Sequence, residues 1–125
     1  MIKTDLIQKA FKNELGDALL FFDIWETRTG KILTSINHNE DYANTFSKYV
    51  IDVATQMREL GFPLLDTFQI AQLEMDSLHL ILKLNNQYIM GCLLDSSKFS
   101  YKELHSEMIP NLLESFKQIV GDDNW

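Results

Sequence analysis

The sequence predicts an α+β fold in which helices cover both faces of a five-stranded antiparallel sheet. The expected order of elements is α-β-β-α-β-β-β-α, with two groups of hairpin-connected strands on either side of a long helix. Two strands, at Ala18–Trp25 and Gln87–Leu94, are apolar at both odd and even positions. Such strands are typical of a sheet that is covered on both faces.

The N-terminal part predicts a helix followed by a β-hairpin. Apolar residues at helical spacing predict a helix over Thr4–Leu15, with Thr4 as its N-cap. The next apolar run predicts a strand over Ala18–Glu26, and a second strand follows at Lys31–Ile36. Gly30 lies between them, where a tight turn needs positive φ.

The middle of the chain predicts one long amphipathic helix, Asp41–Leu60, which ends before Gly61 and Pro63. Its apolar residues fall within about one-quarter of the helical circumference. They are Tyr42, Phe46, Tyr49, Val50, Val53, Met57 and Leu60. We expect this stripe to pack on one face of the sheet, with the terminal helices on the other.

The C-terminal half predicts a three-stranded meander and a last helix. Strands are expected at Thr67–Glu74, Leu78–Leu84 and Gln87–Leu94, with a type I′ turn at Asn85-Asn86. The last of these strands is expected to be central, because it is apolar on both faces.

The last helix is expected to begin with a capping box formed by Ser100 and Glu103. Pro110 lies inside its apolar repeat and should kink the helix or split it, because proline removes a backbone hydrogen bond. We therefore predict a single domain over residues 1–120, followed by an acidic, frayed tail at 121–125.

Composition limits the kinds of partner. The chain has 125 residues and a net charge of −7. This acidic balance argues against binding to nucleic acid or to an anionic membrane, since both reward basic surfaces. The longest apolar run, Ala18–Phe22, is far shorter than a membrane span. No secretory signal is visible at the N-terminus, so we expect a cytoplasmic protein.

No set of residues predicts catalysis or a cofactor. The histidines His38, His79 and His105 are scattered, and the single cysteine, Cys92, lies in an apolar run that favours burial. No metal-ligand spacing, phosphate-binding glycine loop or nucleophile motif is present. We therefore predict no enzyme, no metal site and no cofactor.

With these elements in place, the chain resembles the Roadblock/dynein light chain family, a relative of longin domains with a profilin-like fold. Ala18–Asp23 and Thr29–Leu33 look like the first hairpin of that family. Leu78–Leu84 and Tyr88–Leu94 look like its last hairpin. The resemblance covers nearly the whole chain.

The resemblance implies a homodimer that acts by protein–protein contact. Members of the family pair through the middle helix and the edge strand after it. They bind or regulate small Ras-like GTPases, or act as scaffolds in motor and signalling complexes. Carried over to this chain, the interface comprises Lys48, Ile51, Asp52, Thr55, Phe68, Ile70 and Gln72.

The residues themselves add two observations in favour of this surface. Ile51 is a large apolar residue well off the apolar stripe of the helix. The strand Thr67–Glu74 lacks the Pro and Lys residues that usually protect an exposed edge. The alternative function is a small-molecule sensor, which would show a cavity between sheet and helix with a few convergent polar groups.

Overall fold

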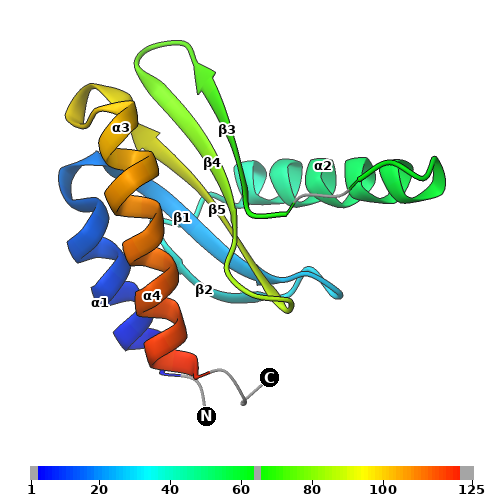
Figure 1. Cartoon of the computed structure of the whole chain (residues 1–125), viewed down its shortest axis with the longest axis horizontal. Helices are drawn as coiled ribbons and strands as arrows, with labels where there is room; N and C mark the ends of the chain where they lie inside the picture. Colours follow the sequence, from blue (N-terminus) through cyan, green and yellow to red (C-terminus); the bar gives the residue numbers. More distant parts are fainter. Residues whose placement is uncertain (1–2, 64–65, 122–125) are drawn as a thin grey trace.

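Five strands form one antiparallel sheet in the order β2-β1-β5-β4-β3, so the predicted fold class is confirmed (Figure 1). The computed structural model describes residues 3–63 and 66–121, apart from the side chains of residues 46, 47, 50, 51 and 54. The strands are β1 (Leu19–Glu26), β2 (Ile32–Ile36), β3 (Phe68–Leu73), β4 (Ser77–Lys83) and β5 (Tyr88–Asp95). The strand β5, which is apolar at both odd and even positions, is central, as predicted.

Helices lie on both faces of the sheet. The helices α1 (Thr4–Leu15) and α4 (Ile109–Val120) pack side by side on one face (Figure 1). The helix α2 (Glu40–Glu59) lies on the other. The predicted acidic tail lies outside the described residues, except for Gly121.

The main core lies between the sheet and the helices α1 and α4. Alternate residues of the three central strands point into it, as the period of two in a strand requires. The largest fully buried side chains are Ile7, Phe11, Phe22, Ile24, Leu78, Leu80, Leu82, Met90, Leu94, Leu104, Leu112 and Phe116. Phe11 contacts both Phe22 and Phe116 through tilted ring pairs, at centroid distances of 5.7 and 6.4 Å.

The predicted last helix consists of three helical segments, and a π-helical turn lies just before Pro110. A short helix α3 (Tyr101–Glu103) begins at the predicted capping box of Ser100 and Glu103. It continues as a π-helix over Leu104–Met108, in which the N–H of Ile109 donates to the carbonyl of Leu104. The regular α-helical hydrogen-bond ladder is therefore interrupted immediately before Pro110.

Two predicted local features are wrong. Lys3, and not Thr4, occupies the N-cap of α1, and no side chain caps that helix end. Asn85 and Asn86 do not have the positive φ of a type I′ turn. Instead, the side-chain oxygen of Asn85 accepts hydrogen bonds from the N–H groups of Gln87 and Tyr88, and the carbonyl of Tyr88 accepts from the N–H groups of Leu84 and Asn85.

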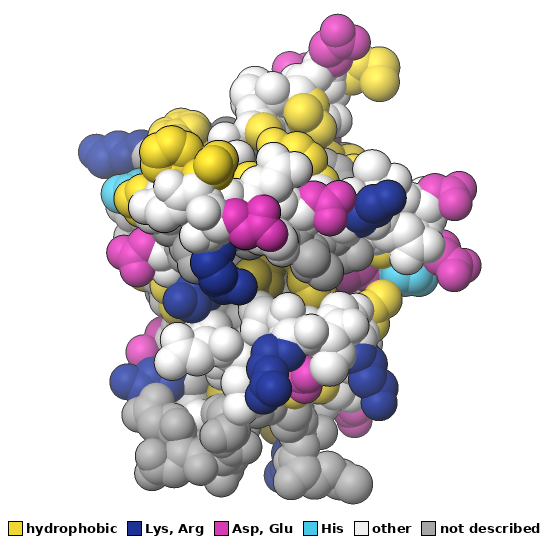
Figure 2. Space-filling view, turned by 90° about the vertical axis from the view of Figure 1, so that its right-hand side faces the viewer, with side chains coloured by type: hydrophobic (Ala, Val, Ile, Leu, Met, Phe, Trp, Pro, Cys, Tyr) yellow, Lys and Arg dark blue, Asp and Glu magenta, His cyan; other side chains and the backbone are white. Residues whose placement is uncertain are grey.

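The predicted burial of the apolar stripe on α2 is also wrong for much of the stripe. Tyr49 is 53 % exposed, Leu60 is 69 % exposed, and Val53 is exposed as well. The reason is geometric, because the C-terminal half of α2 extends beyond the edge of its own sheet (Figure 1). Hydrophobic side chains accordingly gather on the upper part of the face toward which α2 points (Figure 2).

Candidate interaction surface

An apolar groove lies between α2 and the outer part of the sheet. It has a volume of about 300 Å³ and is lined by Thr45 and Tyr49 of α2, Gln69, Ala71 and Leu73 of β3, and His79 and Ile81 of β4. Its lining is mostly apolar. Tyr49 belongs both to this lining and to the exposed stripe of α2, so the two apolar surfaces adjoin.

The N-terminal end of α2 is held on the sheet. The side-chain oxygen of Asn39 accepts from the N–H of Tyr42 and caps the helix. The ring of Tyr42 meets Phe21 of β1 edge to face at 4.4 Å and His79 of β4 at 5.8 Å. Burial raises the pKa of Tyr42 and lowers that of His79 to about 4, so both groups are neutral at pH 7.

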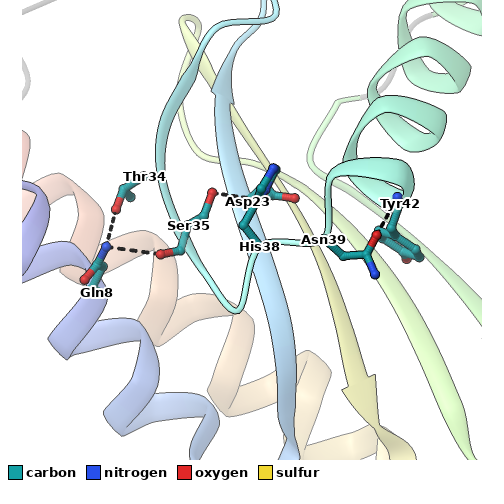
Figure 3. A network of polar contacts seen from close by, with 7 residues as sticks. All are labelled: Gln8, Asp23, Thr34, Ser35, His38, Asn39 and Tyr42. Carbon is teal, nitrogen blue, oxygen red and sulfur yellow. Dashed lines mark hydrogen bonds and ion pairs between the residues drawn. The ribbon is translucent and has the colours of Figure 1, made fainter.

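A buried carboxylate fixes the segment that leads into α2. Asp23 of β1 is almost fully buried, and its Oδ1 accepts a hydrogen bond of 2.6 Å from Ser35 Oγ on β2 (Figure 3). The same oxygen lies 2.7 Å from Nδ1 of His38, just before the helix. Asp23 thus ties β1, β2 and the start of α2 together, so α2 is anchored at one end and projects at the other.

The two edges of the sheet differ. At the β2 edge, Gln8 of α1 donates to Thr34 Oγ1 at 2.7 Å and to the carbonyl of Ser35 at 3.1 Å (Figure 3). A helix side chain therefore covers part of that edge. β3 is the other edge, and it has neither the Pro nor the Lys that protects exposed strands. The groove borders this unprotected strand.

Solved structures share this arrangement of five strands and three main helices. MglB of Myxococcus xanthus superposes with a TM-score of 0.67 at 9 % identity, covering 93 % of this chain and 94 % of that one. A Roadblock/LC7 domain from Streptomyces avermitilis gives 0.60 at 10 % identity, covering 95 % and 94 %. The fold is that of a Roadblock/LC7 domain. The fold that the sequence resemblance implied is therefore confirmed.

Two further structures with the Roadblock/LC7 fold are similar. The gliding protein MglB of Thermus thermophilus gives a TM-score of 0.61 at 11 % identity, covering 91 % of this chain and 90 % of that one. MglB in a tetrameric arrangement gives 0.61 at 10 % identity, covering 92 % and 90 %. No protein-family model and no curated protein matches the sequence.

On this Roadblock/LC7-like fold, the predicted interface residues divide into two groups. Lys48, Asp52 and Thr55 are exposed on α2. Phe68 and Ile70 of β3 are half-buried and pack against the α1–α4 core. They therefore lie on the face of the sheet opposite to α2. These two groups do not form one patch within a single chain.

Two predicted interface residues need separate description. Gln72 is exposed at the end of β3, where its amide donates to the Ser77 carbonyl at 3.0 Å and to Ser96 Oγ at 3.1 Å. The side chain of Ile51 lies outside the described part of the structure. Which residues of this surface contact a partner therefore stays a prediction.

Sequence reasoning missed the exposed apolar residues that line the groove and continue past it. It assigned Tyr49 and Val53 to the core because their helical spacing matched a buried stripe. The missing signal was tertiary, since the stripe is longer than the sheet that it could cover. Leu73 was likewise missed, although it is 41 % exposed and lines the groove.

The described residues hold few groups that suit catalysis. Burial raises the pKa of the Cys92 thiol, which opposes formation of a reactive thiolate. His105 pairs edge to face with Phe68 at 5.7 Å, so aromatic packing accounts for the position of its ring. No group of three or more His, Cys, Asp or Glu side chains among the described residues is placed to hold a metal ion. None of the described helices is long and apolar enough to cross a membrane.

Proposed function

We propose that this protein is a non-catalytic, cytoplasmic interaction domain that forms a homodimer through α2 and β3. In that state it would bind a small Ras-like GTPase or act as a scaffold for a larger complex. One observation carries the homodimer: the C-terminal half of α2 projects past its own sheet, and Tyr49, Val53 and the following Leu60 are exposed.

Physical chemistry supports a protein partner for this part of the helix. A helical segment of fewer than about 12 residues is marginal in water without tertiary packing. The burial of apolar surface gives roughly 25 cal/mol per Å², so a second copy that covered the stripe would stabilise the helix and the pair together. The open edge of β3 offers backbone groups for strand pairing at the same place.

Self-complementarity favours a second copy as that partner. Each chain carries both a projecting apolar helix and an apolar groove beside an open edge, so a two-fold axis would satisfy both copies at once. Among the similar structures, MglB occurs in a tetrameric arrangement, which supports self-association of this fold. The GTPase partner rests on the family resemblance of the sequence alone.

The test is the mass of the protein in solution, measured by size-exclusion chromatography with light scattering. We expect a dimer at about 100 μM and a monomer for Val53→Asp, because a carboxylate in the interface would have to be desolvated. The variants Lys48→Ala and Asp52→Ala test whether the polar side of α2, which was part of the interface predicted from the sequence, also contributes to the dimer. A wild-type protein that stays monomeric would overturn the proposed homodimer.

A second candidate function is a small-molecule sensor, and the groove is the observation that favours it. Its volume of about 300 Å³ lies at the lower end of the range for ligand sites, and Thr45, Gln69 and His79 supply polar groups. A monomeric protein whose melting temperature rises with a small amphipathic ligand, and whose response is lost in Ala71→Trp, would favour the sensor.

A further inference from the structure

We propose that Met75, at the tip of the β3–β4 hairpin, is a contact residue for a second copy of this chain. The inference rests on the proposed homodimer and names a residue beyond the surface predicted from the sequence. Met75 is 92 % exposed, the highest value among the large hydrophobic residues that the structure describes as exposed. The hairpin tip that carries it stands at the top of the view in Figure 1.

The backbone at this tip is unfavourable for Met75. Met75 has φ +59° and Asp76 has φ +53°. This left-handed region suits Gly and Asn and disfavours a residue such as Met, because Cβ comes close to the following carbonyl. Met75 is thus poorly suited both to its conformation and to its exposure to water, so turn formation does not account for it.

Hydrogen bonds hold the tip in place. The carbonyl of Asp76 accepts from the N–H of Ser96 at 2.8 Å, and Gln72 donates to both the Ser77 carbonyl and Ser96 Oγ. These contacts fasten both arms of the hairpin to the start of the loop after β5. The side chain of Met75 is therefore presented from a fixed base, which lowers the entropy lost on binding.

The position of the tip points to a second copy. Leu73, two residues before Met75, lines the apolar groove, so the tip continues the surface of the proposed dimer. Antiparallel pairing of two β3 edges about a two-fold axis places the end of one strand beside the start of the other. Each tip then lies near the start of the partner's β3, where the flexible, apolar side chain of methionine can pack against the neighbouring surface.

The test compares two substitutions at one site by sedimentation equilibrium. Met75→Asn suits the left-handed backbone but removes the apolar tip, so we expect the dimer dissociation constant to rise about tenfold or more. Met75→Leu keeps an apolar side chain of similar volume, so we expect a change of less than about threefold. Circular dichroism checks that each variant is folded, and Met75→Gly gives a second variant that removes the side chain.

The outcomes separate this inference from the proposed function. If the wild type is a dimer and Met75→Asn has the same or a lower dissociation constant, the proposed contact is overturned but the homodimer is not. Equal weakening in Met75→Leu and Met75→Asn would also overturn it, since the apolar character of the side chain would then be irrelevant. A wild-type monomer would overturn the proposed homodimer itself.

Discussion

The indole ring of Trp25 on β1 lies directly against the backbone of Gly91 on β5, on the face of the sheet that carries α2. A Cβ atom at position 91 would lie 2.9 Å from Cη2 and from Cζ3 of Trp25, closer than real contacts allow. Trp25 is only 4 % exposed, so the ring cannot swing out freely. The glycine is therefore needed for space, and φ at Gly91 is not in the left-handed region.

We predict that Gly91→Ala lowers the free energy of unfolding by about 1–3 kcal/mol, the usual cost of overpacking a well-filled site. Urea denaturation followed by circular dichroism measures it. The ring of Trp25 is the cause in this account, so Trp25→Leu should remove most of the added penalty. A double-mutant cycle that gave no coupling between the two positions would contradict the close contact as the reason.

The carboxylate of Asp23 supports a second prediction. Asp23→Ala leaves the Ser35 hydroxyl and the His38 ring without their shared acceptor, which should cost about 1–3 kcal/mol of stability. His38→Ala should cost less, because that ring is partly solvated and can bond to water. Asp17→Ala, at an exposed carboxylate, serves as the control and should change stability by less than about 0.5 kcal/mol.

The measurement for this network is again the free energy of unfolding, together with hydrogen exchange at the start of α2. If Asp23 anchors the helix, exchange of the amides near Ala43 should accelerate in Asp23→Ala and not in Asp17→Ala. Similar exchange in the two variants would show that the network does not hold the helix.

The order of strands and helices could be predicted because local patterns and their spacing largely determine it. Each helix and strand of the sheet was placed within one or two residues, since apolar periodicity marks which face of each element is buried. The central position of β5 followed from its apolar character on both faces. These signals lie within one element and need no knowledge of its neighbours.

The candidate interaction surface could not be predicted in the same detail, because it depends on how long α2 is relative to the sheet and on contacts between different elements. The helical spacing of Tyr49 and Val53 predicts a buried stripe. Only the dimensions of the sheet show that part of this stripe is exposed. Met75 has positive φ although methionine does not signal it, whereas Asn85-Asn86 carry the signal for positive φ without adopting it. At Asn85, hydrogen bonds from the side chain and the backbone hold a different turn.

Cys92 should report on global unfolding. Its side chain is fully buried, and burial raises the pKa of the thiol. We predict that the thiol reacts with a disulfide reagent only when the central strand opens, so the labelling rate should follow the unfolding equilibrium. Rapid labelling of the folded protein, at a rate independent of added urea, would contradict this burial.

Acidification should destabilise the protein through His79, which lies in the wall of the groove. Burial lowers its pKa to about 4, whereas an unfolded histidine has a pKa of about 6.5. The unfolded state therefore binds the proton more readily, so the stability linked to this group is complete above about pH 6.5 and declines as the pH falls toward 4. The loss by pH 4 should be on the order of 2 kcal/mol.

The measurement is the free energy of unfolding from pH 7.5 to 4.5, compared between the wild type and His79→Asn. The asparagine does not titrate in this range. Below pH 6.5, the free energy of unfolding of His79→Asn should therefore fall less with pH than that of the wild type, and the difference is the contribution of His79. Carboxylates titrate in both proteins, and their effect cancels in the difference. Parallel curves for the two proteins would mean that His79 accepts its proton without disturbing the folded state, and that the wall of the groove is open to water.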